Sequence, residues 1–264
     1  MTGRGYSTGL TQVLGGLVLA FLMLPILAVV PASLNQSSFI KIPPDIYSTR
    51  WYVALVKDVG WTTAILASTQ VAVLATCLSV ALGTLAALGL ERLGRWWRSL
   101  LTGLVLAPLI VPVIMTSIAL YYVMRRLGLH GSILGLALGH TLLCLPFVVL
   151  NVGVSLARLD PFLLRAAAGL GAKPLYAFRT VTLPAIKPGL AAGAAFAFIT
   201  SFDEVVISIF LAGANAKTLP VKLWEQIRIE FTPVAAAGST VILVVTVLLF
   251  LLVQLFRSRG ASLR

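Results

Sequence analysis

Charged side chains are scarce in this chain, at 11% of its 264 residues, whereas soluble globular domains carry about 25%. Eight residues are acidic, two are histidines and two are cysteines. Neither His130 nor His140 has a carboxylate and a nucleophile near it in the sequence, and the spacing of Cys77 and Cys144 matches no zinc motif. The composition excludes an ordinary soluble domain, and the sequence predicts no catalytic residue, no metal site and no cofactor.

A nucleotide-binding loop is also lacking. The segment from Gly213 to Thr218 ends in a lysine–threonine pair, but it has no glycine before the lysine to let backbone amides surround a phosphate. The net charge is +12, yet the basic residues are spread over short loops and form no stripe, which argues against nucleic-acid binding. If the protein moves a solute against a gradient, the energy must come from an ion gradient or from a partner.

Hydrophobic residues are abundant, at 59% of the chain. Apolar segments long enough to cross roughly 30 Å of hydrocarbon lie at 13–33, 62–90, 100–122, 132–156, 189–212 and 235–256. The first is longer than the apolar region of a cleaved signal peptide. We therefore expect an all-α polytopic membrane protein with about six transmembrane helices, embedded in the lipid bilayer. Three prolines inside the third and fourth segments are expected to kink them: Pro108, Pro112 and Pro146.

The basic residues also predict an orientation. With an even number of spans both termini lie on one side of the membrane, and that side carries twelve of the twenty lysines and arginines. Because cytoplasmic loops carry an excess of lysine and arginine, the sequence predicts that both termini are cytoplasmic.

The longest non-spanning segment, 156–188, has the signals of a structured loop. Asp160–Pro161 is typical of a helix start, since the carboxylate can cap free N–H groups and proline fits the first helical position. Gly171 is expected to end this helix, and Pro174 to begin a second one that ends before Leu183–Pro184. Two short helices around a glycine would make a platform for docking another protein; the alternative is an ordinary surface loop.

Two adjacent carboxylates, Asp203 and Glu204, fall inside the fifth apolar segment. Placing a carboxylate at bilayer depth costs at least roughly 2.5–3.5 kcal/mol, so the pair needs water, a cation or a partner. It either forms a negative wall of a pathway for cationic solutes, or serves as an ion pair or helix cap at a bundle interface. His140, in the fourth segment, is expected to be a polar packing residue, with a pathway role as the alternative. Glycines at packing spacing lead into the same segment: Gly131, Gly135 and Gly139.

Residues 165–174, followed by 178–184, resemble the EAA loop of binding-protein-dependent ABC transporter permeases. Arg165 stands where that family usually has a glutamate, so a salt bridge made by that glutamate is not carried over to this chain. The matching positions are Ala166, Ala167, Gly171, Leu183 and Pro184.

Further segments are similar to the PotC-like branch of this family, the second permease of spermidine/putrescine importers. These are residues 201–210, 218–220 and 224–228, together with the outer segment that contains Pro43–Pro44 and Arg50–Tyr52. The resemblance covers nearly the whole chain.

The resemblance implies a type I ABC importer in the bacterial inner membrane. A second related permease would complete the pathway, an ATP-binding cassette ATPase dimer would hydrolyse ATP in the cytoplasm, and an external or periplasmic binding protein would deliver the solute. The chain itself would be a transport subunit and no enzyme. The residues expected at the ATPase-docking loop are Ala166, Ala167, Gly171, Ala172, Pro174, Leu183 and Pro184.

The implied organisation has an N-terminal part, residues 1–60, with the tail, the first span and an external segment. The permease core is 61–257, the coupling loop within it is 156–188, and a cytoplasmic tail follows at 258–264. The expected solute is polyamine-like, such as spermidine or putrescine, with Asp203 and Glu204 on its pathway. Other solutes (an amino acid, an aminovalerate-like amine or a phosphonate), a secondary transporter or channel, and a scaffold subunit are the alternatives.

Overall fold

The structure is a computed structural model that describes residues 4–213, 216–229 and 232–261. These residues form helices, and the long connection 34–49 between the first two helices contains one isolated antiparallel bridge between Asn35 and Tyr47. The predicted all-α fold is confirmed. The last residues of the predicted tail, 262–264, lie outside the described part of the chain.

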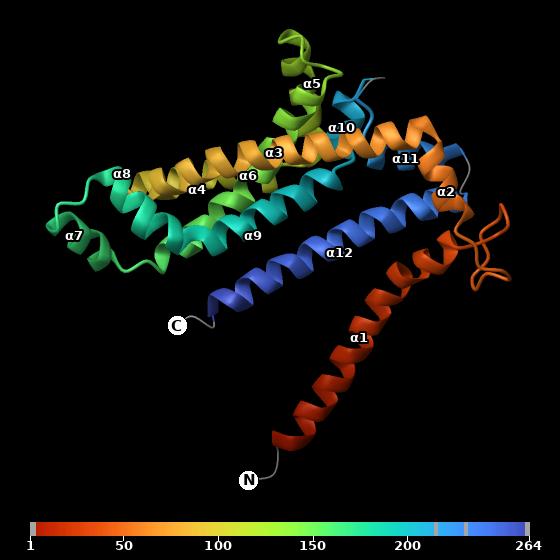
Figure 1. Ribbon diagram of the computed structural model, residues 1–264, viewed down its shortest axis with the longest axis horizontal. Helices are drawn as coiled ribbons and strands as arrows, with labels where there is room; N and C mark the ends of the chain where they lie inside the picture. The colour runs from red at the N-terminus through yellow and green to blue at the C-terminus, as the bar shows by residue number, and fades with distance from the viewer. Residues whose placement is uncertain (1–3, 214–215, 230–231, 262–264) are drawn as a thin grey trace. The chain divides into compact units, whose positions relative to one another are not determined.

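In chain order, the helices are α1 (Arg4–Ser33), α2 (Arg50–Lys57), α3 (Val59–Glu91), α4 (Arg95–Leu106), η1 (Ala107–Leu109), α5 (Val113–Arg126), α6 (Ile133–Ala157), α7 (Pro161–Gly169), α8 (Pro174–Ala177), η2 (Phe178–Thr182), α9 (Leu183–Phe202), α10 (Val206–Leu211), α11 (Leu219–Ile229) and α12 (Pro233–Ala261) (Figure 1).

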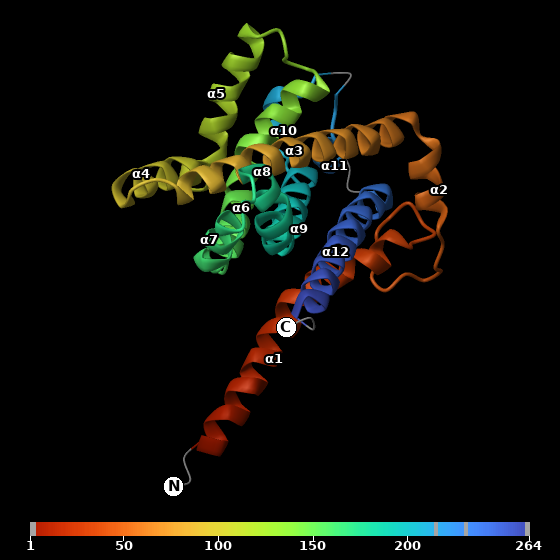
Figure 2. The ribbon, with the colours of Figure 1, turned by 60° about the vertical axis from the view of Figure 1, so that its left-hand side comes forward.

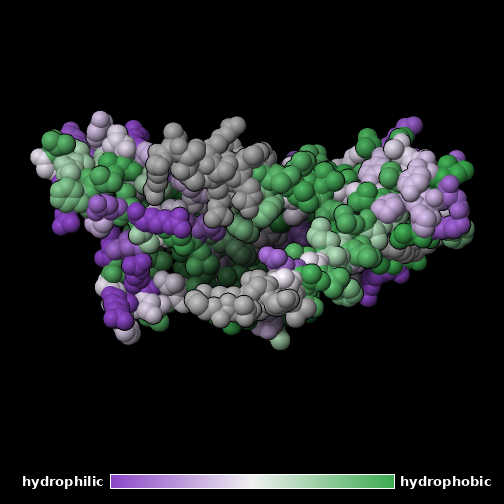
Figure 3. All heavy atoms as spheres, turned by 90° about the horizontal axis from the view of Figure 1, so that it is seen from below, coloured by the Kyte–Doolittle hydropathy of each residue, from purple (hydrophilic) through white to green (hydrophobic). Residues whose placement is uncertain are grey.

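Within the described residues, five helical segments are long and apolar enough to cross a membrane: α1, α3, α6, the stretch from α8 through α9, and α12. A sixth crossing results if α4 and α5 count as one bent span. Figure 3 shows many hydrophobic residues on the surface of the protein, where lipid would cover them. The expectation of about six transmembrane helices is therefore confirmed, and the chain is a multi-pass membrane protein.

The third apolar segment, 100–122, does not form the continuous helix that the sequence predicts. Its two halves, α4 and α5, are bent by 95°, and Figure 2 shows α5 turned away from the direction of α4. Pro108 lies in the short η1 turn and Pro112 caps the start of α5. Each proline removes a backbone N–H from the helical ladder and clashes with the preceding turn, which explains the break. Pro146, in contrast, lies within an unbroken α6.

The fifth segment also differs from its predicted bounds of 189–212. The helix already begins at Pro174, passes through the π-helical turn η2 and continues as α9 to Phe202. The second short helix, α8, ends before Leu183–Pro184 as predicted, but the sequence did not indicate that it continues into α9 without a gap. Pro184 lies in the first turn of α9, where a missing N–H costs little, and the wider π turn joins the two helices without a gap.

The described chain divides into two compact units. Unit 1 combines Met1–Thr62 with Leu223–Leu243 and contains the predicted external segment. In that segment the Trp51 indole N–H donates to the Asn35 carbonyl oxygen at 2.7 Å, and the hydroxyls of Ser33 and Tyr52 lie 2.6 Å apart. Unit 2 combines Thr63–Lys222 with Val244–Arg264 and contains all the predicted site residues.

The core of unit 2 is built around α6, which packs along α9. Close approach depends on two glycines that face Val148. A Cβ on Gly83 of α3 would lie 2.8 Å from the Val148 Cβ, and one on Gly193 of α9 would lie 3.0 Å from the Val148 Cα. Because neither glycine carries a side chain, α3 and α9 both come within contact of the same residue of α6.

The direction of these helices follows from their contacts. The Ser79 hydroxyl donates to the Thr141 carbonyl at 3.5 Å, and further along both helices Gly83 meets Val148, so α3 and α6 run parallel. The connections that follow α3 and α6, residues 92–94 and 158–160, consequently lie on the same side of unit 2.

Candidate functional site

The first helix of the predicted docking loop begins as its sequence indicates. The Asp160 carboxylate accepts a hydrogen bond from the Phe162 N–H at 2.8 Å, and Pro161 is the first residue of α7. The carboxylate satisfies a backbone donor that has no partner within the helix, and an acidic group is favoured at that end by the helix dipole. The predicted helix start is confirmed.

The same helix ends in a Schellman motif. The Ala172 N–H donates to the Ala167 carbonyl and the Gly171 N–H to the Ala168 carbonyl, both at 3.0 Å. Gly171 has φ of +80°, a left-handed conformation that costs residues with a Cβ roughly 1–2 kcal/mol. A Cβ at Gly171 would meet nothing within 4 Å. The glycine is thus required by its backbone conformation and not by crowding.

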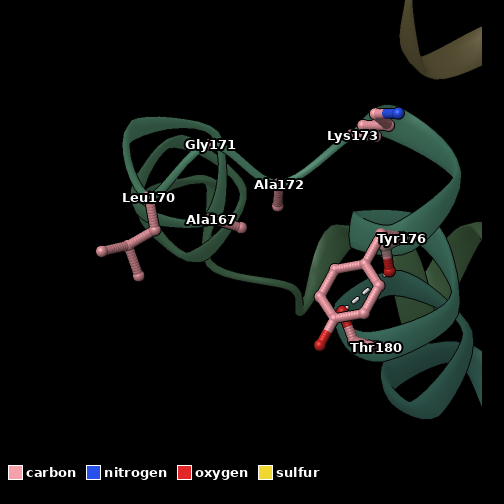
Figure 4. A pocket seen from close by; sticks show the side chains of 7 residues that line it. All are labelled: Ala167, Leu170, Gly171, Ala172, Lys173, Tyr176 and Thr180. Atoms are coloured by element: carbon pink, nitrogen blue, oxygen red, sulfur yellow. Dashed lines mark hydrogen bonds between the residues drawn. The ribbon is translucent and has the colours of Figure 1, made fainter.

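Beyond this turn, α7 and α8 enclose a shallow pocket of about 470 Å³ (Figure 4). The Thr180 hydroxyl donates to the Tyr176 carbonyl at 2.8 Å and fixes one wall. The residues that line the pocket are Ala167, Leu170, Gly171, Ala172, Lys173, Tyr176 and Thr180. Three predicted docking residues, Ala167, Gly171 and Ala172, are therefore brought together.

The loop exposes large apolar side chains. Leu170 is 90% exposed, and Phe162, Leu175 and Tyr176 are also mostly exposed. The Arg165 guanidinium lies 5.9 Å from the centre of the Phe162 ring. An exposed group of apolar side chains among basic ones is typical of a protein interface.

The remaining predicted docking residues are spread along the loop. Ala166, Pro174 and Pro184 are exposed. Leu183 is different, because its side chain packs against the apolar core of unit 2. The structure thus separates a surface part of the motif from one residue that anchors α9.

The two carboxylates of the fifth segment lie at a break between helices, not within one. Asp203 follows the last residue of α9, and Glu204 precedes α10. The continuous helix predicted over 189–212 is therefore interrupted at these two carboxylates. The break leaves the first N–H groups of α10 without helical partners, and a carboxylate can accept hydrogen bonds from such groups and is favoured at that end by the helix dipole.

Glu204 supplies that stabilisation. Its Oε1 accepts hydrogen bonds from the Val206 N–H at 2.7 Å and the Ile207 N–H at 2.9 Å. Asp203 is exposed, and the described residues offer its carboxylate neither an ion pair nor a hydrogen bond. The two neighbours therefore differ: Glu204 caps a helix, and Asp203 presents an unpaired negative charge.

His140 connects the two sides of this break. It is 1% exposed; its Nδ1 lies 2.9 Å from the Ser201 hydroxyl on α9, and its Nε2 lies 3.0 Å from the Ser208 hydroxyl on α10. One ring nitrogen donates and the other accepts, so a neutral imidazole satisfies both contacts. The packing role expected for His140 agrees with this geometry.

The sequence reasoning missed Ser201 and Ser208. The two serines lie on either side of the carboxylate pair within a largely apolar segment, and polar side chains in that setting were the available signal. A neighbouring contact closes α10 onto α6: a Cβ on Gly139 would lie 3.2 Å from the Ile207 side chain. The predicted close packing at this glycine is confirmed.

Residues 79–260 match the family described as binding-protein-dependent transport system inner membrane component. The match covers more than half of the chain. The protein therefore belongs to this family of ABC importer permeases.

Among curated relatives, the chain is 30% identical to the spermidine/putrescine transport system permease protein PotC of Escherichia coli K12, over 90% of each chain. It is 33% identical to the putrescine transport system permease protein PotI of the same organism, over 84% of this chain and 82% of the relative. It is also 34% identical to the molybdenum transport system permease protein ModB of Mycobacterium bovis, over 75% of this chain and 80% of the relative.

A solved structure has the same fold. A chain of a bacterial ABC transporter involved in the import of the acidic polysaccharide alginate superimposes with a TM-score of 0.73, covering 96% of this chain and 98% of that one. The two sequences are 17% identical, so this likeness concerns the fold alone.

Proposed function

We propose that this chain is the permease subunit of an ABC importer for di- or polyamines such as putrescine and spermidine. It forms the pathway with a second related permease, is driven by an ATP-binding cassette ATPase dimer, and receives its solute from an external or periplasmic binding protein. The observation that carries the proposal is the similarity to PotC and PotI, which extends over 90% and 84% of the chain.

The ATPase docks on the α7–α8 loop. The exposure of Leu170 and Tyr176 beside the pocket supports this assignment, because a partner would bury apolar surface that the chain itself leaves uncovered. The Schellman turn at Gly171 fixes the angle between α7 and α8. Closure of the ATPase dimer then moves the loop as a rigid body, and the attached helices turn the pathway from one side to the other.

The cargo is cationic. An unpaired carboxylate at the Asp203 break is costly in a membrane unless water or a cation faces it, and the ammonium groups of a diamine supply that cation. The Glu204 carboxylate already accepts hydrogen bonds from the N–H groups of α10. We therefore assign the pathway charge to Asp203 and treat Glu204 as the residue that holds α10 in place.

Both termini and the docking loop are cytoplasmic. The parallel course of α3 and α6 supports this topology, since it puts the basic connection 92–94 on the same side as the docking loop. The permease core comprises residues 61–257, in accord with the family match at 79–260. Residues 1–60 precede it, and the coupling loop 156–188 lies within it.

A different cargo is the second candidate. The similarity to ModB, named for molybdenum transport, supports it, because identity in this range is shared by permeases for unlike solutes. If the binding protein selects the solute, the permease itself need not discriminate between solutes. The residue that distinguishes the candidates is Asp203, which would repel an anionic solute.

The test uses the complete importer. The chain is purified with its ATPase, second permease and binding protein, reconstituted in proteoliposomes, and assayed for ATP-dependent uptake of radiolabelled putrescine. We expect putrescine or spermidine to stimulate ATP hydrolysis through the binding protein, and molybdate to leave it unchanged.

Two outcomes would contradict the proposal in different ways. Uptake that proceeds without ATP, on an imposed proton or sodium gradient, would indicate a secondary transporter. ATP-dependent uptake of another solute, with no response to polyamines, would retain the importer and replace its cargo.

A further inference from the structure

A second charged region of unit 2 lies apart from the docking loop and the helix break. It surrounds the turn between α3 and α4, where every residue from 91 to 100 is exposed. Arg98 is paired with Glu91 at 2.5 Å. Arg92 and Arg95 have no ion-pair or hydrogen-bond partner among the described residues. The turn therefore carries two uncompensated positive charges.

Two tryptophans accompany these arginines. The rings of Trp96 and Trp97 pack edge to face with centroids 4.7 Å apart, and Trp96 is 67% exposed. Tryptophan is enriched where hydrocarbon meets the lipid headgroups, because its ring is apolar and its N–H needs a polar partner. Arginine beside it extends its charge toward the headgroups and leaves its aliphatic part in the apolar layer.

The helix that follows has two apolar faces. Leu101 and Val105 pack against the core of unit 2. Trp96, Leu100 and Leu104 lie four residues apart and form an exposed stripe, with Leu104 68% exposed. Nothing in the described part of unit 2 covers this stripe, and it begins beside Arg95.

We propose that this region is a binding site for an anionic phospholipid such as phosphatidylglycerol. Arg92 and Arg95 hold the phosphate of the headgroup, Trp96 lies at the level of the glycerol backbone, and an acyl chain lies along Leu100 and Leu104. We name these residues the α4 lipid site.

The depth of the site in the membrane supports a lipid as its occupant. Arg92 directly follows the last residue of the apolar α3, and no charged residue lies between Asp58 and Glu91, so the arginines stand where the apolar run ends. Anionic lipids attract basic side chains near the membrane surface. An acidic protein surface or free phosphate would complement the charge but would leave the stripe of Trp96, Leu100 and Leu104 uncovered.

The test is native mass spectrometry of the full-length chain, delipidated in detergent and titrated with phosphatidylglycerol or phosphatidylcholine of equal chain length. We expect the wild-type chain to prefer phosphatidylglycerol. Since each basic residue near an anionic surface contributes a factor of roughly five, the double variant Arg92→Gln/Arg95→Gln should lose at least about tenfold of that preference. Arg92→Lys/Arg95→Lys should retain most of it.

The matched control removes the same charge elsewhere. Arg158 and Arg179 are exposed and lie within the docking loop, outside the α4 lipid site, so Arg158→Gln/Arg179→Gln should leave the lipid preference unchanged. An equal loss of phosphatidylglycerol preference in the control variant would refute the proposed α4 lipid site. The absence of that preference in the wild-type chain would refute it as well. Competition by soluble glycerol phosphate would overturn the lipid as occupant. Loss of ATPase co-purification by the Arg92/Arg95 variant, with lipid preference unchanged, would assign the surface to a protein instead.

Discussion

Substitution of the two adjacent carboxylates should give opposite defects, although their side chains differ by one methylene. The changes are Asp203→Asn, Glu204→Gln and Glu204→Ala. If Asp203 is the pathway charge and Glu204 the cap of α10, the first variant should assemble normally and transport poorly. Glu204→Gln should behave nearly as the wild type, because an amide oxygen still accepts N–H hydrogen bonds.

The loss at Asp203 can be bounded. Two unit charges 4 Å apart interact by about 1 kcal/mol in water and about 4 kcal/mol at an effective dielectric constant of 20. Asp203 is exposed, which favours the lower part of this range. Removing the charge should therefore reduce putrescine uptake by at least about fivefold, with about a thousandfold as the upper bound.

The loss at Glu204 has another cause. Glu204→Ala removes the acceptor of two hydrogen bonds at the start of a six-residue helix. Loss of a cap costs roughly 0.5–2 kcal/mol in water, and more where no water replaces the acceptor. The alanine variant should thus unfold at a lower temperature in detergent and accumulate to a lower level in the membrane.

The assays are uptake by the reconstituted importer and thermal unfolding of the purified chain. Full assembly of Asp203→Asn together with putrescine transport at the wild-type rate would contradict the role of Asp203. Loss of transport by Glu204→Gln at normal abundance would put the functional charge on Glu204 instead.

Three further predictions concern other parts of the chain. Gly171→Glu should insert normally but reduce ATPase co-purification and stimulated ATP hydrolysis, because the left-handed turn costs a side-chain-bearing residue about 1–2 kcal/mol; Gly169→Ala, in the preceding helix, should change neither. Gly193→Leu should lower the thermal stability of the purified chain by roughly 1–3 kcal/mol, because a Cβ there would lie 3.0 Å from the backbone of α6. A cysteine at Ser99 should be shielded from an impermeant thiol reagent in intact cells, and one at Ser37 should be labelled.

Controls and contrary outcomes complete these tests. Gly153→Ala should be tolerated, because a Cβ there meets nothing within 4 Å; equal destabilisation at both glycines would refute the close-packing argument. A cysteine at Lys173 should be shielded like the one at Ser99, and the reverse labelling pattern would overturn the topology. Unchanged stimulation and uptake in Gly171→Glu would remove that residue from the coupling site.

The docking loop was the part most open to prediction, because its signals are local. Asp160 before Pro161 marks the start of α7, and Gly171 marks its end. Neither signal refers to a distant residue. Leu183 was less predictable. Its place in the family motif suggested the surface, but its side chain packs on the core of unit 2, and that contact depends on how α9 lies against α6.

Two helix breaks show why apolar length alone was insufficient. The run at 100–122 is long enough to span, yet Pro108 and Pro112 divide it and the halves diverge by 95°. The run at 189–212 contains no internal proline, yet it also breaks. Hydropathy predicts which segments can lie in lipid. It does not predict where a helix is interrupted because side chains, in place of the helix itself, satisfy the backbone N–H and C=O groups.

The break after Phe202 persists because its polar groups have partners on both sides. Glu204 accepts hydrogen bonds from the N–H groups at the start of α10. His140 contacts Ser201 before the gap and Ser208 after it. With these requirements met by neighbours, Asp203 is not needed for the fold and can remain unpaired. A sequence shows two carboxylates of nearly equal chemistry, and only the positions of distant partners distinguish them. We therefore expect the charge that the fold leaves without a partner to be the one that a cationic solute meets.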